Sequence, residues 1–437
     1  MSYADFLASK RVDPAPLGFD SIGSNPDLFE WQSRVVDYVT DMGSAAIFAD
    51  CGLGKSRMQL DFADRVVGES GGRVLVLAPL SVVSQTVAEG VACGVEVREV
   101  AGREDVAGEP RGVFITNFEK LHRFDPADFD GVVLDESSIL KSSNGATRTA
   151  MIDFADGMRF RLACSATPAP NNVIELLQHS QFLGRGTVDA VKARFFTTNM
   201  SRENSSEKYR LKGHAASDFY DYVSAWAVCL RSPADVGGDA HSYGLPALTV
   251  TPEVVDAEIH AEGQLFPTEI GGIGGRARVR RETRPMRVAR TAGIVNAWDT
   301  QSIVWVGTND ESETITDSIE GAVEVTGSMS PEHKRDAFDA FKAGDFQTLV
   351  TKPTIAGFGL NFQNAHRMAF CGIGDSYEQY YQAIRRCYRF GQTMPVDVRV
   401  VVSDLEQEIA HNVARKQDSH STITNELAAR NRVAVPA

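Results

Sequence analysis

The sequence lacks the features of an exported or membrane protein. No apolar run approaches the roughly eighteen residues that a helix needs to cross a bilayer. The amino-terminal stretch MSYADFLASKRVDPAPLGFD has neither the charged-then-apolar pattern of an export signal nor the Arg-rich composition of a transit helix. These absences predict a cytoplasmic protein without a membrane partner.

Grouped cysteines are also missing. The chain has 6 cysteines in 437 residues, and no two of them form a CxxC pair. Scattered cysteines are typical of reduced thiols, whereas a disulfide framework or a zinc site needs cysteines at close, regular spacing. We therefore expect no metal site built from cysteine.

An excess of basic residues is absent from the chain as a whole. It carries 44 Lys and Arg against 58 Asp and Glu, a net charge of -14, which repels a polyanion. One segment differs, because residues 276–290 contain seven arginines and a single acid, Glu282. Any nucleic acid is therefore expected to contact this segment. The arginines predicted to do so include Arg276, Arg278, Arg280 and Arg281. The alternative is a solvated helix or a disordered loop.

Apolar strand-like runs alternate with helical stretches between residues 28 and 183. The runs lie at 45–50, 73–79, 112–117, 131–136 and 161–167. This rhythm predicts a parallel sheet wrapped by helices. Polar residues, glycine or proline follow each run, so we expect the chemistry at the carboxyl ends of the strands, where open α/β sheets bind ligands.

The same rhythm returns from residue 300, which predicts a second α/β lobe. Its runs lie at 301–307, 322–327, 346–352, 367–372 and 396–402, with a helix at 330–344 between the second and the third. The intervening region has no rhythm but contains a probable helix at 218–230, and a final helix from 404 is expected to pack across the second lobe. We predict an amino-terminal extension (1–27), a first lobe (28–195), a mixed connector (196–290) and a second lobe (291–437).

A glycine-rich turn joins the first strand-like run to a helical stretch. It reads DCGLGKSR at residues 50–57, and Ala49 replaces the first glycine of the general GxxxxGK[ST] pattern. Backbone N–H groups and a helix amino terminus in this arrangement cradle phosphates. Lys55 would reach the β and γ phosphates, and the Ser56 hydroxyl would hold Mg²⁺. The predicted nucleotide contacts are Gly52, Leu53, Gly54, Lys55, Ser56 and Arg57. A structural turn with a chance GKS is the alternative.

Two further motifs follow strands of the first lobe. Asp135 and Glu136 end the run GVVLDE, where Asp135 can support Mg²⁺ and Glu136 can polarise the attacking water. Ser165 and Thr167, in SATP, could link hydrolysis to a bound strand. A solvated turn and a simple turn before proline are the respective alternatives.

The second lobe carries a helix-like stretch at 377–392 with Gln382, Arg386 and Arg389. Two arginines three residues apart share one helix face. Projected across a cleft onto the γ phosphate, they would stabilise transition-state charge, a contribution of roughly 10³- to 10⁵-fold in rate. A solvated basic helix is the alternative.

Upstream, the segment 354–362 reads TIAGFGLNF, which predicts a glycine-interrupted turn into a short helix. Such a turn allows close approach of a phosphate backbone, although a plain strand-to-helix turn has the same pattern.

In this order and at these distances, AxxGxGKS, DESS, SATPAPNN, AGFGLNF and QAIRRCYRFGQ resemble superfamily 2 helicases, especially the Swi/Snf-like branch, whose signature is QAxxRxxRxGQ. The resemblance covers residues 28–183 and 300–416. It implies two RecA-like P-loop NTPase lobes joined by a mixed connector, with ATP and Mg²⁺ as cofactors, and ATP-driven translocation on double-stranded DNA. It also makes Gln32 the adenine-reading residue and matches Asn171 and Glu175. The nucleic-acid contacts it implies are Asn117, Lys141, Ser165, Thr167, Thr354, Gly357 and Asn361.

The acidic motif departs from the family pattern, because Ser137-Ser138 replaces the more usual Ala-His or Ala-Asp. The compact build and the opening SYADFLASKR resemble small bacteriophage or prophage helicases, which implies a bacterial or phage-infected cytoplasm, replication or recombination proteins as partners, and a monomer. Three other interpretations stay open: a P-loop NTPase without a nucleic-acid track, an RNA-directed helicase, and a scaffold that has lost hydrolysis.

Overall fold

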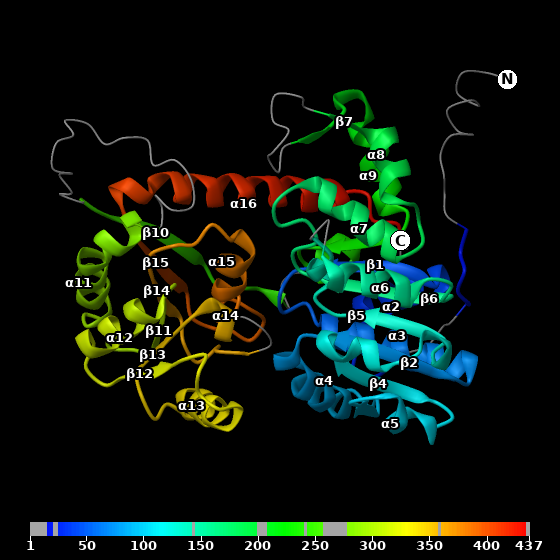
Figure 1. The fold of residues 1–437 in the computed structure, drawn as a ribbon, viewed down its shortest axis with the longest axis horizontal. Coiled ribbons are helices and arrows are strands. Elements are labelled where there is room, and N and C mark those ends of the chain that lie inside the picture. The colour runs from blue at the N-terminus through cyan, green and yellow to red at the C-terminus, as the bar shows by residue number, and fades with distance from the viewer. Residues whose placement is uncertain are drawn as a thin grey trace. The chain divides into compact units, whose positions relative to one another are not determined.

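The computed structural model describes residues 15–20, 25–141, 145–198, 208–239, 243–256, 278–356 and 360–433. The chain divides into two compact units, Met1–Tyr243 with Asp418–Ala437, and Gly244–Gln417. Each unit is built on one parallel sheet flanked by helices, so the predicted α/β fold with two lobes is confirmed (Figure 1). The units divide the chain at other positions than the predicted boundaries, since the predicted connector supplies strands to both sheets.

The first unit contains a seven-stranded sheet in the order β3-β4-β2-β5-β6-β1-β9, with every neighbouring pair parallel. Its strands are β1 (Ser44–Ala49), β2 (Arg73–Ala78), β3 (Val97–Glu99), β4 (Gly112–Asn117), β5 (Gly131–Leu134), β6 (Phe160–Ser165) and β9 (Ala227–Leu230). β1, β5 and β6 are buried along their whole length, as expected of strands covered on both faces. A hairpin of β7 (Phe196–Thr198) and β8 (Tyr209–Leu211) stands apart from this sheet.

Two hydrophobic cores lie on the two faces of this sheet. Successive side chains of β1 alternate between them, with Ala46 and Phe48 in one and Ala45 and Ile47 in the other. The flanking helices are α2 (Glu30–Met42), α3 (Lys55–Ser70), α4 (Leu80–Ala92), α5 (Arg103–Ala107), α6 (Ala146–Ala155), α7 (Leu176–Phe182), α8 (Val188–Phe195) and α9 (Ala216–Ser224). Parallel strands buried in this way read as continuous apolar runs, which is why the sequence revealed them.

The predicted helix at 218–230 is wrong in its second half. Helix α9 ends at Ser224, and Ala227–Leu230 forms β9, which pairs with β1 at the edge of the sheet. A short continuous apolar run does not distinguish a buried strand from the end of a helix, because it shows neither the helical period of about 3.6 residues nor the strand period of about 2. Asn431 closes the outer side of β9, since its side chain accepts from the Cys229 N–H at 2.9 Å and donates to the Cys229 carbonyl at 2.8 Å.

The second unit contains a six-stranded parallel sheet in the order β10-β15-β14-β11-β13-β12. Its strands are β10 (Leu248–Val255), β11 (Ser302–Trp305), β12 (Ala322–Val325), β13 (Thr348–Thr351), β14 (Arg367–Cys371) and β15 (Val396–Ser403). Its helices are α11 (Arg284–Val295), α12 (Asn309–Ser318), α13 (Pro331–Ala343), α14 (Pro353–Ala356) and α15 (Tyr377–Ile384). The five predicted strands and the predicted helix at 330–344 are confirmed, and β10 was not predicted.

The final helix, α16 (Gln407–Ala428), contributes to both units. Ile409 and Val413 belong to the core of the second unit, whereas Ile423 and Leu427 belong to the core of the first. The prediction that this helix packs across the second lobe therefore holds for its first half only. Among the described helices, α16 included, none has the length and apolar character to cross a membrane.

A buried ion network ties the second unit together. Arg287, which is 0% exposed, donates to Glu311 at 2.7 Å and to the Cys371 carbonyl at 2.9 Å, and its Nε lies 3.2 Å from Glu406. Burial lowers the pKa of Arg287, but the Glu406 and Glu311 carboxylates raise it above its ordinary value. The network joins α11, α12, the end of β14 and the turn Asp404–Glu406.

Replacing Arg287 should therefore destabilise the second unit severely. Arg287→Leu removes the cation that pairs with two buried carboxylates and leaves, within the described residues, only the longer contact of Arg280 with Glu311 at 3.7 Å, which costs about 3–5 kcal/mol. The control Arg284→Ala removes a solvent-exposed pair with Asp310 (2.8 Å) and should cost less than about 1 kcal/mol. Urea unfolding followed by circular dichroism measures both, and equal stability of the two variants would contradict a structural role for the network.

Candidate functional site

Three loops predicted to carry chemistry meet at one edge of the first sheet. β5, β6 and β1 are adjacent and parallel, so the residues after Leu134, Ser165 and Ala49 lie at the same edge. The carboxyl ends of parallel strands are where open α/β sheets bind ligands. The structure therefore brings together motifs that are far apart in the sequence.

The loop after β1 depends on its two glycines. Gly52 and Gly54 have φ values of 87° and 76°, in the left-handed region that favours glycine. A Cβ on Gly54 would also collide with Nε2 of Gln32, which donates to the Leu53 carbonyl at 3.0 Å. Oε1 of Gln32 accepts from the Phe29 N–H at 2.9 Å. The predicted adenine-reading glutamine is thus 3% exposed and supports the loop directly.

The loop leads into the amino terminus of α3. Gly54 is the N-cap of this 16-residue helix and offers no side chain to its first N–H groups, which suits an anion. Nζ of Lys55 lies over the loop, donating to the carbonyls of Ala49 at 2.7 Å and Asp50 at 3.3 Å. Arg57 forms an ion pair with Glu89 of α4. The side chain of Arg57, a predicted nucleotide contact, is therefore engaged by another element.

Asp135 follows β5 and is 5% exposed. Burial raises the pKa of its carboxyl above the ordinary value. The charge of Lys55, the Gln59 side chain and the Glu136 N–H act in the opposite direction and reduce this rise. A buried carboxylate near the ammonium of Lys55 is an arrangement that a magnesium-bound nucleotide fits, because the metal would supply a positive charge for the carboxylate and the phosphates a negative charge for the ammonium. Ser56 and Asp135 are the residues that would hold the metal.

Glu136 has a strained backbone. Its φ of 51° makes it the one non-glycine residue with a positive φ in the described part of the chain. Its N–H donates to Oδ1 of Asp135 at 3.0 Å, and its carbonyl accepts from the Ile139 N–H at 3.1 Å. Such conformations cost about 1–3 kcal/mol and persist where the surroundings enforce them, often at active sites.

His179 is a part of this site that the sequence did not reveal. Oγ of Ser137 lies 3.0 Å from Nε2 of His179 in α7, and both residues are 0% exposed. Burial lowers the pKa of His179 to about 4, so the imidazole is neutral at physiological pH. The two residues are 42 positions apart, and nothing in the local pattern around His179 distinguishes it from a core residue.

The loop after β6 lies inside the first unit. Ser165 and Thr167 are 0% exposed, and the Thr167 N–H donates to Oγ of Ser165 at 3.1 Å. Within the described residues, Oγ1 of Thr167 has no hydrogen-bond partner. Further on, Glu175 accepts from the backbone and side-chain N–H groups of Asn171 at 3.0 and 2.9 Å.

Two other predicted nucleic-acid contacts of the first unit differ in exposure. Asn117 is 5% exposed and caps the turn Phe118–Arg123 by accepting from the Lys120 N–H at 3.1 Å. Lys141 is exposed at the end of the turn Ser137–Lys141. The Lys141 side chain is therefore accessible to a ligand, whereas the Asn117 side chain is buried and caps a turn.

In the second unit, the predicted helix at 377–392 is wrong beyond Ile384. Arg386 and Arg389 lie in turns after α15, so they do not share a helix face. The Arg386 carbonyl accepts from the Phe362 N–H at 2.9 Å, so the backbone after α15 bonds to the segment before β14 and not to a further helical turn. Both side chains bond to the same segment, since Arg386 donates to the Leu360 carbonyl at 3.1 Å and Arg389 donates to Oδ1 of Asn361. Gln382, on α15, is 2% exposed.

The structure thus brings Asn361 together with both predicted catalytic arginines. Gln392 reinforces this arrangement by donating to the carbonyls of Ala365 at 3.0 Å and Cys387 at 3.2 Å. The short helix predicted after the glycines of 354–362 instead precedes them, as α14, where Thr354 is exposed. Gly357 lies outside the described residues.

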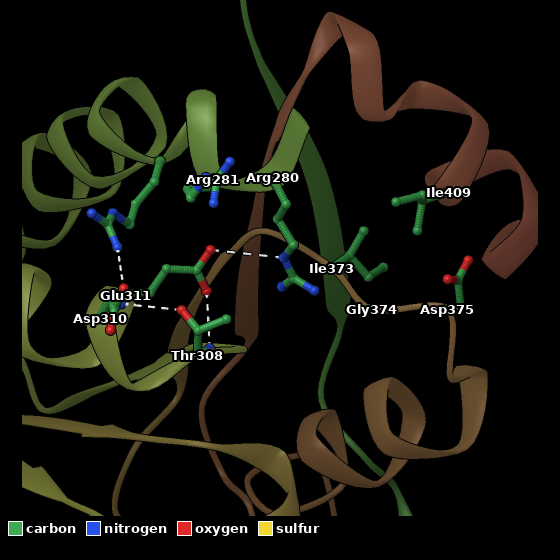
Figure 2. A pocket seen from close by; sticks show the side chains of 10 residues that line it. Arg280, Arg281, Thr308, Asp310, Glu311, Ile373, Gly374, Asp375 and Ile409 are labelled. Atoms are coloured by element: carbon green, nitrogen blue, oxygen red, sulfur yellow. Dashed lines mark hydrogen bonds and ion pairs between the residues drawn. The ribbon is translucent and has the colours of Figure 1, made fainter. Parts of the chain in front are cut away.

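The arginine-rich segment lines a pocket of about 430 Å³ at the carboxyl ends of the adjacent strands β11 and β14 (Figure 2). Arg280 faces Glu311 at 3.7 Å, and Arg278 pairs with Glu282 at 2.7 Å. Arg281 is exposed and forms no ion pair within the described residues. Arg276 lies outside them. In the described part of the arginine-rich segment, Arg281 is therefore a predicted contact that is exposed and forms no ion pair.

His179 should make the stability of the first unit sensitive to acid. Its folded pKa of about 4 lies below the ordinary 6.5, so its contribution is complete above pH 6.5 and is lost as the pH falls towards 4. The expected loss is about 3 kcal/mol. His179→Gln, which does not titrate, should lose less stability between pH 7 and 4.5 in urea unfolding. Parallel pH profiles of the two proteins would contradict a buried neutral imidazole.

Comparison with known proteins adds evidence for the second unit. Residues 288–391 match the family described as the helicase conserved C-terminal domain. This range contains β11 to β14 together with Asn361, Arg386 and Arg389. No curated protein matches the chain.

A solved structure described as the Sulfolobus solfataricus SWI2/SNF2 ATPase core in complex with double-stranded DNA is similar to the chain. The similarity covers 95% of this chain and 99% of that one, with 17% sequence identity and a TM-score of 0.43. The family match over 288–391 agrees with the expectation drawn from the motifs of the second lobe, because a helicase conserved C-terminal domain is what the segments around Asn361, Arg386 and Arg389 predict.

Proposed function

We propose that the chain is an ATP-dependent, Swi/Snf-like translocase that moves along double-stranded DNA. The observation that supports it best is the meeting of Lys55 and Asp135 at the edge of the first sheet, in a chain whose second unit contains the helicase conserved C-terminal domain. Duplex DNA, as opposed to RNA, follows from the resemblance of QAIRRCYRFGQ to the Swi/Snf-like signature.

In this proposal, the amino terminus of α3, Lys55, Ser56 and Asp135 hold a magnesium-bound ATP. When bound, the metal neutralises phosphate charge and orients the phosphates for in-line attack. Glu136 polarises the attacking water. Gln32 supports the loop through its hydrogen bond to the Leu53 carbonyl. Gly52 and Gly54 have no side chains, which lets the backbone approach the phosphates.

The second lobe completes the reaction. Arg386 and Arg389 stabilise the charge that develops on the γ phosphate. Arg386 bonds to Leu360 and Arg389 to Asn361, both in the segment 354–362 predicted to contact DNA. Hydrolysis would then depend on closure of the two lobes on the track. Finer parts of the proposal are a bacteriophage or prophage origin, work as a monomer in a bacterial or phage-infected cytoplasm, and replication or recombination proteins as partners.

The first test is the ATPase rate with single-stranded DNA, duplex DNA and RNA. A translocase should hydrolyse ATP faster on its track, and displacement of a triplex-forming strand would report movement without strand separation. Lys55→Ala should abolish hydrolysis and weaken nucleotide binding. A rate that no polymer changes would favour a P-loop NTPase of another class.

Removal of the Arg389 guanidinium should slow turnover while nucleotide binding is kept. We expect Arg389→Ala to lower kcat by about a thousandfold, since arginines of this kind act on transition-state charge. The control is Arg385→Ala, which removes a neighbouring arginine stacked on the ring of Tyr388 at 5.0 Å. Turnover of Arg389→Ala within threefold of wild type would refute the proposed role.

Arg281 should contribute a phosphate contact to DNA binding. Arg281→Gln is expected to flatten the slope of log affinity against log salt concentration by about 0.9, the value for one lost contact on duplex DNA. The control Arg278→Gln changes an arginine of the same segment that already pairs with Glu282. Fluorescence anisotropy across a salt series measures both slopes, and an unchanged slope for Arg281→Gln would remove this residue from the DNA site.

A further inference from the structure

We propose that His179 is a positioning residue for Glu136 and acts on it through Ser137. The inference rests on the proposed function, in which Glu136 polarises the attacking water. It is carried by two independent observations in the first unit: the strained backbone of Glu136, and a buried hydrogen bond on the residue that follows it.

The direction of the hydrogen bond follows from its surroundings. Nδ1 of His179 lies 3.4 Å from the carbonyl oxygen of Glu175, and a carbonyl oxygen only accepts. The proton of the neutral imidazole is therefore on Nδ1. Nε2 is left as an acceptor, so the Ser137 hydroxyl donates to it at 3.0 Å.

The imidazole is fixed on its other sides as well. The ring of Phe48, from β1, meets it edge to face with centroids 5.2 Å apart. Phe48 and His179 are 2% and 0% exposed, so the ring is held within the core that joins β1 to α7. An acceptor held this firmly can set the position of the group that donates to it.

Ser137 is placed where such a bond matters. Glu136 holds a φ of 51°, which a non-glycine residue adopts only when its neighbours enforce it. Before Glu136, the Oδ1 of Asp135 accepts its N–H, and after it the buried Ser137 is tethered to α7. Without the second tether, the backbone can relax towards an ordinary φ and move the Glu136 carboxylate away from the water it polarises.

His179 is also connected by hydrogen bonds to the segment that follows β6. His179 bonds to the carbonyl of Glu175, whose carboxylate accepts both N–H groups of Asn171. Asn171 follows the SATPAP segment predicted to respond to the bound strand. Hydrogen bonds on the side chain and on the carbonyl of Glu175 therefore connect this loop, through the covalent structure of Glu175, to His179 and to the residue after Glu136.

Three variants separate positioning from mere packing. Ser137→Ala removes the donor, and His179→Asn withdraws the acceptor, since asparagine reaches only the position of Nδ1. His179→Gln places an amide oxygen near the position of Nε2 and restores the acceptor. Ser224→Ala is the matched control, because it removes another buried serine hydroxyl of the same unit, which donates to the Tyr220 carbonyl at 2.8 Å.

The measurement is steady-state ATPase activity with saturating duplex DNA, with ATP varied. Ser137→Ala and His179→Asn should each lower kcat about tenfold or more with KM for ATP within twofold, since small misplacements of a reacting group have effects of that order or larger. The double variant should be no slower than either single one, because both changes break the same bond. His179→Gln should keep at least half of the wild-type kcat, and Ser224→Ala should match wild type.

Other results would overturn the inference. These are a wild-type kcat for Ser137→Ala, additive losses in the double variant, an effect on KM alone, or a His179→Gln variant as slow as His179→Asn. A wild-type rate no higher than that of Lys55→Ala would instead refute the proposed function, and with it the role of Glu136. The two failures are therefore distinguishable within one set of assays.

Discussion

The buried carboxylate of Asp135 imposes the constraint on which the first unit depends. A carboxylate at the end of a covered strand is unfavourable unless cationic and hydrogen-bonding groups surround it. Lys55 and the Glu136 N–H provide these groups, and they come from α3 and from the loop after β5. The order of the central strands, β5-β6-β1, is what brings those elements to one edge. The strand order therefore determines which groups compensate the buried charge of Asp135.

In the second unit, the buried charges belong to ion pairs that stabilise the fold. Arg287 forms ion pairs with both Glu311 and Glu406 inside the unit, so this part of the arginine-rich segment stabilises the fold. Arg281, six residues earlier, is exposed in the same segment. One stretch of sequence thus combines structural arginines with an arginine that can meet a phosphate. The net charge of the segment does not distinguish a structural arginine from one that contacts a phosphate, because each adds one positive charge.

Much of the fold could be predicted because parallel strands covered on both faces read as apolar runs. The strands missed are instructive: β9 continues the apolar pattern of α9, and most of β10 is exposed, so its residues do not form an apolar run. The motif residues Lys55, Asp135 and Arg389 were identified from spacing. His179 was not, since its bond to Ser137 spans 42 positions and exists only once α7 is packed. The spacing of Arg386 and Arg389 suggested a helix, but the backbone after α15 bonds to the segment before β14 and not to a further helical turn.

The edge strand β9 determines where the first unit can be cut. A fragment ending at 195, the predicted end of the first lobe, would strip β9 from β1 and leave a fully buried strand with an open row of backbone N–H and C=O groups. Such an edge recruits other chains and promotes aggregation. Extending the fragment through β9 would restore the pairing but would still omit Asn431, whose amide occupies the outer side of that strand. An isolated first unit suitable for biophysical work therefore needs the carboxyl-terminal segment supplied as a fusion or as a separate peptide.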